Sequence, residues 1–147
     1  MLHYGNKPND ILMKNIVSHV FDGTPSRIVT PVKVYNPFTG QGVETGALWD
    51  TGATCSAVSK NLSEFLKLKR LGKMKVDGSF KSKVVDTHYI NLYIGKDFKE
   101  SLFVGTFENK VTTCIDVIIG MDIINKGDLI IGHYDGKTHF SFQIYSK

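Results

Sequence analysis

The feature that most constrains the fold of this chain is the shortness of its apolar segments. From Ile11 onward most of them are rich in Val, Ile, Phe and Tyr, and Gly, Asn, Asp or Pro interrupts them at short intervals. This pattern is typical of β-strands joined by turns. Pro31 indicates that its own strand lies at an edge or is irregular. Strands are expected at 27–35, 43–49, 88–95, 101–107, 129–134 and 138–145.

Helical signals are scarce beside this strand pattern. A helix is expected over 59–72, with Ser59 as its N-cap and Gly72 as its stop. A second, shorter helix is expected over 121–127. Two hairpins are expected, one over 74–84 and one around the Asp-Gly-Lys turn at 135–137. The sequence therefore predicts a mostly β domain with one or two short helices.

The composition sets only broad limits on function. The chain has 147 residues, 41% of them hydrophobic, which suits one domain with a real core. Its formal charge of +4 is compatible with an acidic partner but does not identify one. No apolar run reaches the roughly 18 residues of a membrane helix, and no signal peptide is recognised, so no membrane association is expected. Two cysteines suit free thiols in a reducing compartment, and a cytoplasmic location is expected.

The stretch LWDTGAT at 48–54 carries the strongest chemical signal. An apolar strand ends there in Asp50, and small residues follow at once. A carboxylate at the end of a buried strand is costly unless something pairs with it or uses it. Small hydroxyl and glycine neighbours allow close approach of backbone and can donate hydrogen bonds to the carboxylate. Such a loop suits a general acid or base. It could also be a tight turn in which Asp50 caps its own backbone.

This loop resembles the active-site loop of the aspartic peptidases. A second element of that family is a pair of apolar residues and a glycine late in the domain, which DVIIGMDII at 116–124 matches. The order of segments is similar to the single-domain, retropepsin-like group, and closest in pattern to its bacterial and cellular members. The resemblance implies a closed, mixed-barrel-like β domain with one lobe per chain over 27–147. Residues 1–26 form an N-terminal extension of unknown role.

The resemblance implies a homodimer, because the chain holds a single Asp-Thr-Gly copy. The Asp50 residues of both subunits would share one proton and activate a water that hydrolyses a peptide bond. No metal and no cofactor are implied. Thr51 would lock the two loops across the dimer axis, Gly52 would let backbone approach a carboxylate, and Ala53 would border the cleft. The loop would be supported from below by Ile118, Ile119 and Gly120.

The hairpin over 74–84 is the candidate flap that would cover an extended peptide substrate. Its tip would be formed by Asp77, Gly78 and Ser79. A charged residue at this tip departs from the glycine-rich flaps of the family. Met121-Asp122 stands where the viral enzymes carry Arg-Asn after the Ile-Ile-Gly segment. Both departures bear on dimer geometry and peptide specificity, and an ordinary surface hairpin is the alternative for 74–84.

Simpler roles are expected for the cysteines, the histidines and the basic residues. Cys55 is expected to be a buried thiol rather than a nucleophile, and Cys114 a core residue of a strand. The five histidines show no metal-ligand spacing. A basic stretch fits a solvated face better than a nucleic-acid surface, so a nucleic-acid partner is not favoured. This stretch contains Lys67, Lys69, Arg70, Lys73, Lys75, Lys81 and Lys83.

Three functions remain open from sequence. The first is the dimeric aspartic endopeptidase. The second is the same fold without catalysis, as a peptide-binding or dimerisation module. The third is a basic β-domain that binds nucleic acid, for which binding would depend on salt and survive Asp50→Asn.

Overall fold

The chain is rich in strands and poor in helix, as the sequence predicts. The computed structural model describes residues 12–77, 81–109 and 114–146. The elements in chain order are β1 (Leu12–Asp22), β2 (Val29–Tyr35), β3 (Gly42–Trp49), β4 (Ala57–Ser59), α1 (Lys60–Phe65), β5 (Gly72–Asp77), β6 (Ser82–Ile94), β7 (Phe98–Phe107), β8 (Ile115–Ile119), α2 (Met121–Ile124), β9 (Gly127–Tyr134) and β10 (Lys137–Ser146).

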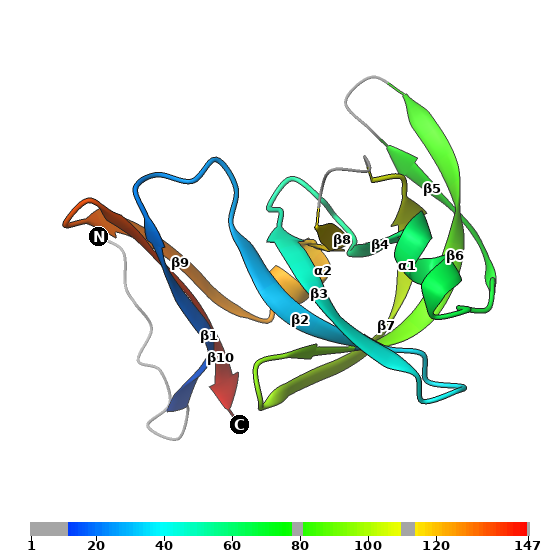
Figure 1. The fold of residues 1–147 in the computed structure, drawn as a ribbon, viewed down its shortest axis with the longest axis horizontal. Coiled ribbons are helices and arrows are strands. Elements are labelled where there is room, and N and C mark those ends of the chain that lie inside the picture. The colour runs from blue at the N-terminus through cyan, green and yellow to red at the C-terminus, as the bar shows by residue number, and fades with distance from the viewer. Residues whose placement is uncertain (1–11, 78–80, 110–113, 147) are drawn as a thin grey trace, which may run out of the picture.

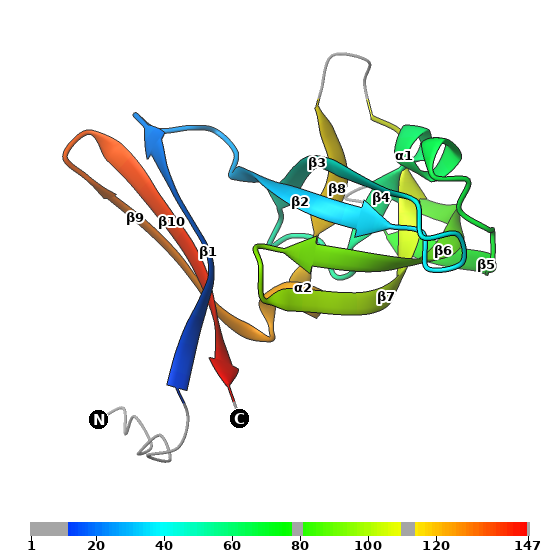
Figure 2. The same ribbon diagram turned by 60° about the horizontal axis from the view of Figure 1, so that its bottom comes forward.

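Six of the strands close into a barrel (Figures 1 and 2). The hydrogen-bonded order is β2-β3-β8-β4-β7-β6, and β6 pairs back with β2 through residues 33–35 and 91–93. The β3–β8 and β4–β7 pairs are parallel, and the other pairs are antiparallel. β5 continues the sheet beyond β6 and forms a hairpin with it. The closed, mixed barrel expected from sequence is therefore confirmed.

A second sheet, β1-β10-β9, lies beside the barrel (Figure 1). The Trp49 ring joins the two sheets, because it lies 5.1 Å from the Phe140 ring and 5.0 Å from the Phe142 ring. β1 pairs with β10 from Leu12 to Asp22, so this part of the N-terminal extension is hydrogen-bonded to the terminal strand. Residue 27 as the domain boundary stays a prediction.

Both helices are shorter than the sequence indicates. Ser59 is the N-cap of α1, as expected, and accepts a hydrogen bond from the Leu62 N–H. The helix ends at Phe65 rather than Gly72, because Lys67 adopts a left-handed φ of 50° and turns the chain. The buried Asn36 amide then donates to the carbonyls of Leu66 and Lys67, which satisfies the end of the helix. α2 ends at Ile124, before the predicted stop at residue 127.

Candidate functional site

The candidate site begins where β3 ends, at a firmly anchored tryptophan. Trp49 is buried against the β10 phenylalanines, and its indole N–H donates to the Thr30 hydroxyl at 2.9 Å. The Asp50 N–H then donates to the Ile119 carbonyl at 2.9 Å, so the loop leaves β3 attached to β8. This anchoring fixes the position of the Asp50 backbone relative to the barrel.

The loop after Trp49 folds back on the Asp50 carboxylate. The Gly52 N–H donates to Asp50 Oδ1 at 2.8 Å, and the Ala53 N–H donates to the Asp50 carbonyl at 3.2 Å. Asp50 is half-buried, while Thr51 and Gly52 are exposed. Within the described residues, Asp50 Oδ2 accepts no hydrogen bond. One carboxylate oxygen is thus held in place, and no described residue donates to the other.

The Ile-Ile-Gly segment lies directly against this loop. β8 runs between β3, to which it is parallel, and β4, to which it is antiparallel. Ile119 is fully buried and Ile118 is half-buried. A Cβ on Gly120 would stand 2.8 Å from the Ala53 carbonyl oxygen and 2.8 Å from the Cys55 carbonyl carbon. Only glycine therefore allows the Asp50 loop to approach β8 this closely.

α2 holds the far side of the loop through Asp122. The Asp122 carboxylate accepts hydrogen bonds from the Ser56 N–H at 2.9 Å and from the Ser56 hydroxyl at 2.6 Å. The Gly120 N–H donates to the same hydroxyl at 3.0 Å, and the Met121 N–H donates to the Ala53 carbonyl at 2.8 Å. The sequence alone shows Asp122 as a departure from the viral pattern and predicts no role for it. The sequence does contain a signal for this pair: a serine stands six residues after Asp50, and an aspartate stands two residues after Gly120.

A second carboxylate ties β8 to both neighbouring strands at its other end. Asp116 accepts a hydrogen bond from Thr45 on β3 and another from Ser59 on β4, each at 2.7 Å. Charge-assisted bonds of this kind are about twice as strong as neutral ones. The loop and the Ile-Ile-Gly segment therefore form one rigid unit with the strands beside them.

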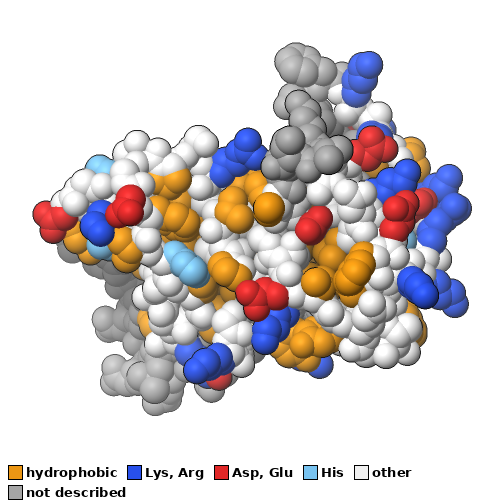
Figure 3. Space-filling model, viewed as in Figure 1, with side chains coloured by type: hydrophobic (Ala, Val, Ile, Leu, Met, Phe, Trp, Pro, Cys, Tyr) orange, Lys and Arg blue, Asp and Glu red, His pale blue; other side chains and the backbone are white. Residues whose placement is uncertain are grey.

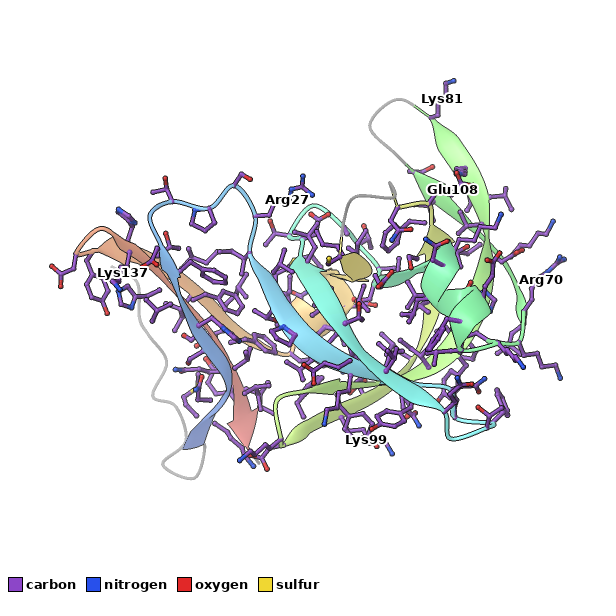
Figure 4. All side chains as sticks on the ribbon, in the orientation of Figure 1. Arg27, Arg70, Lys81, Lys99, Glu108 and Lys137 are labelled. Carbon is purple, nitrogen blue, oxygen red and sulfur yellow. The ribbon has the colours of Figure 1, made fainter. Side chains whose placement is uncertain are left out.

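An open cleft of about 570 Å³ adjoins Asp50. One wall comes from the β1–β2 connection and the end of β3, and the other comes from the second sheet. Figure 4 shows Arg27 beside the turn that follows β3. The lining residues are Thr24, Pro25, Ser26, Arg27, Ile28, Leu48, Trp49, Asp50, Ile131, Gly132, His133 and Thr138.

The segment 74–84 contains the expected hairpin. β5 pairs with β6 in antiparallel register from Gly72↔Thr87 to Asp77↔Ser82. The Ser82 hydroxyl donates to the Asp77 carboxylate at 2.8 Å, next to the tip. Gly78 and Ser79 lie outside the described residues. Lysine and arginine side chains gather over α1 and this hairpin (Figure 3).

Both cysteines differ from expectation. Cys55 and Cys114 are exposed free thiols, so the predicted burial of both is wrong. Ser56 takes the inward position in the loop because it bonds Gly120 and Asp122, and this turns Cys55 outward. Cys114 stands just before β8 rather than within a strand. In the described parts of the chain, no group of three or more His, Cys, Asp or Glu side chains could hold a metal ion. None of the helices described there is long and apolar enough to cross a membrane.

Comparisons with known proteins give a match in structure alone. No model of a known protein family matches the sequence, and no curated protein matches it. A retropepsin-like aspartic protease from Rickettsia conorii has a TM-score of 0.51 at 10% identity, over 92% of this chain and 98% of that one.

Two other solved structures score lower. The Simian Foamy Virus (mac) protease has a TM-score of 0.44 at 17% identity, over 65% of this chain and 92% of that one. The retroviral protease-like domain of Ddi1 from Leishmania major has a TM-score of 0.46 at 14% identity, over 81% of this chain and 95% of that one. The likeness concerns the fold: this chain has the fold of the retropepsin-like aspartic proteases.

Proposed function

We propose that the chain is an aspartic endopeptidase whose catalytic residue is Asp50. The main support for the proposal is the way in which hydrogen bonds fix the position of the Asp50 carboxylate. Its backbone is bonded to β8, Oδ1 accepts from Gly52, Oδ2 accepts no hydrogen bond from a described residue, and Asp50 lines the open cleft beside the second sheet. A carboxylate that served only as a turn cap would not need the close approach at Gly120 or the Ser56–Asp122 bonds beneath it.

The active unit in this proposal is a homodimer. One chain supplies a single Asp-Thr-Gly loop, and Thr51 and Gly52 at its apex are exposed. A two-fold interface through these apices would bring the two Asp50 carboxylates together. Thr51 and Gly52 would then be buried by the partner's loop, and Ala53 would border the shared cleft.

The reaction follows from two carboxyl groups that share one proton. Like charges at close range cannot both ionise, so the pair holds a single proton and orients a water between its oxygens. The ionised Asp50 takes a proton from the water as its oxygen attacks the peptide carbonyl, and the protonated Asp50 donates to the carbonyl oxygen. Collapse of the tetrahedral diol breaks the C–N bond, and a proton passes to the leaving amine. The products are a carboxylic acid and an amine.

The substrate in this proposal is an extended peptide under the β5–β6 hairpin. β5 pairs with β6 alone among the described strands, so its other edge carries backbone groups that an added strand could use. The tip residues Asp77, Gly78 and Ser79 would close over the peptide and exclude water. Ile118, Ile119 and Gly120 would support the catalytic loop without touching the reacting bond.

The test is cleavage of a diverse peptide pool between about pH 3 and 8, with products identified by mass spectrometry. Wild type is compared with Asp50→Asn, which keeps the shape of the side chain and removes its charge. Asp97→Asn is the matched control, because Asp97 is an exposed turn residue that forms an ion pair with Lys14 at 3.6 Å. The proposal predicts cleavage at internal bonds by wild type and Asp97→Asn and none by Asp50→Asn.

Two results would reject the proposal. Equal cleavage by wild type and Asp50→Asn would show that another group is the catalyst. A folded, dimeric wild type that cleaves no peptide would favour a non-catalytic module that binds peptides or dimerises.

A further inference from the structure

Four aromatic rings lie on the outer face of the barrel where β2, β6 and β7 run side by side. Residues directly opposite each other in paired strands share one face of a sheet. Tyr89 is opposite Phe103, and Tyr35 is opposite Asn91. The alternate β6 residues, such as Ile90 and Leu92, are fully buried in the barrel. We call the outer surface formed by Lys33, Tyr35, Tyr89, Asn91, Tyr93, Lys99, Ser101 and Phe103 the aromatic face.

The rings of the aromatic face pair with each other and keep part of their surface open. Phe103 is exposed, and the three tyrosines are half-buried. The centroids of Tyr35 and Tyr93 are 5.3 Å apart in an edge-on arrangement, and those of Tyr89 and Phe103 are 4.8 Å apart. Cross-strand pairs of this kind stabilise a sheet. Phe103 stays 62% exposed at a position where β7 pairs with β6 alone, because β4 joins β7 only from Gly105 onward. The exposed phenylalanine and the open parts of the tyrosine rings beside it form aromatic surface on which a ligand can bind.

Two lysines flank the central tyrosine of this face. Lys33 and Lys99 are both opposite Tyr93 in register, one on each side. Lys99 Nζ lies 5.7 Å from the centre of the Tyr93 ring, and Figure 4 shows Lys99 at the lower edge of the barrel. Neither lysine forms an ion pair with a described residue, although Glu44 is opposite Lys33 on β3. The row Glu44, Lys33, Tyr93, Lys99 therefore holds two positive charges and one negative charge, which leaves a net positive charge beside the Tyr93 ring.

The adjacent row adds a hydrogen-bonding group. Asn91 lies between Tyr35 on β2 and Ser101 on β7. The Ser101 hydroxyl donates to Asn91 Oδ1 at 2.6 Å, which leaves the Asn91 amide N–H groups without a partner in the described chain. An amide fixed in this way can donate to the acceptors on the edge of a base.

We propose that the aromatic face binds single-stranded nucleic acid. Bases stack on exposed tyrosine and phenylalanine rings whatever their sequence, and lysines beside the rings neutralise the phosphates. The rows of the face stand about 7 Å apart, two residues along each strand. Bases in a duplex are already stacked and cannot reach these rings. The two lysines favour a polyanion over a neutral peptide or a sugar. This binding is independent of Asp50 and of any peptidase activity.

The test is fluorescence anisotropy of wild type with a labelled single strand of about twelve nucleotides, as DNA and as RNA. Phe103→Ala is expected to weaken binding about fivefold or more, because one base loses its stacking partner. Replacing both Lys33 and Lys99 by alanine should reduce the slope of log K against log salt by about 1.4. A duplex of equal length should bind more weakly than the single strand.

Two matched controls separate this face from other surfaces. Phe65→Ala removes a ring on α1 that is 59% exposed, and replacing Lys73 and Lys83 by alanine removes the same charge from the β5–β6 hairpin. Neither control should change the affinity by more than about twofold. All the replaced side chains are exposed, and equal urea midpoints will confirm that each variant is folded.

The proposal is overturned by any of three results. One is no binding of the single strand by wild type at about 100 µM, the weak end of non-specific affinity. Another is an affinity that falls when the hairpin lysines are replaced by alanine and does not fall in Phe103→Ala. The third is equal binding of single strand and duplex.

Discussion

Replacing Gly120 by alanine tests whether the contact between β8 and the Asp50 loop sets the geometry of the site. The added Cβ would lie 2.8 Å from the Ala53 oxygen and 2.8 to 2.9 Å from the Cys55 carbonyl. All these atoms are backbone, so the loop must move. Overpacking of this kind costs about 1–3 kcal/mol of the free energy of unfolding. A loop displaced by about 1 Å would also lower a peptidase rate by about 100-fold.

The assay is urea unfolding followed by circular dichroism, at one protein concentration because a dimer would make stability depend on it. Gly72→Ala is the matched control, since a Cβ at Gly72 has no atom within 4 Å. It should leave the midpoint unchanged or raise it slightly. A Gly120→Ala protein that unfolds at the wild-type urea concentration would refute the close approach of loop and β8.

Two further substitutions test the hydrogen bonds around the site and the helix. Asp122→Asn should lower the free energy of unfolding by about 1.5–3 kcal/mol, because the carboxylate accepts two hydrogen bonds from Ser56. Its control in the same urea titration is Asp135→Asn, at an exposed position. Equal urea midpoints for the two variants would contradict the role of Asp122. Asn36→Ala should cost about 1–3 kcal/mol because it leaves the Leu66 carbonyl at the end of α1 without this buried partner. An unchanged urea midpoint would show that water satisfies that carbonyl.

Features with local causes were predictable from the sequence. The turn at Asp135-Gly136 requires positive φ at both positions, and the structure has 55° and 69° there. Pro31 lies in the part of β2 that pairs with β3 alone, since β6 joins β2 only from Lys33 onward. A missing N–H is tolerated at such an edge. The Ser59 N-cap follows from the same kind of local chemistry.

Features set by distant contacts were not predictable. β4 is three residues long and exists because β8 and β7 pair on its two sides. The end of α1 depends on Asn36, which lies 30 residues before Leu66 in the chain. Neither partnership leaves a periodic pattern in the sequence. The exposure of Cys55 was not predictable either, because Cys55 turns outward only when its neighbour Ser56 faces α2.

Some features of the candidate site were likewise predictable from the sequence, and others were not. The Asp-Thr-Gly loop and the Ile-Ile-Gly segment could be recognised because their residue types are restricted by close backbone approach. The structure brings these two segments together. It leaves the roles of Asp50, Thr51 and the hairpin tip as predictions. The aromatic face joins residues from 33 to 103 of the chain and becomes visible only in the strand register.

The most direct test of the central claim is a subunit-mixing measurement on the proposed peptidase. Wild type is held at a concentration where its specific activity no longer rises, and an equal amount of Asp50→Asn is added and allowed to exchange. If one site needs Asp50 from two chains, random pairing leaves about half of the wild-type subunits with wild-type partners, and activity falls to about half. Activity that stays at its starting value would show that each chain cleaves with its own Asp50 and would contradict the shared site.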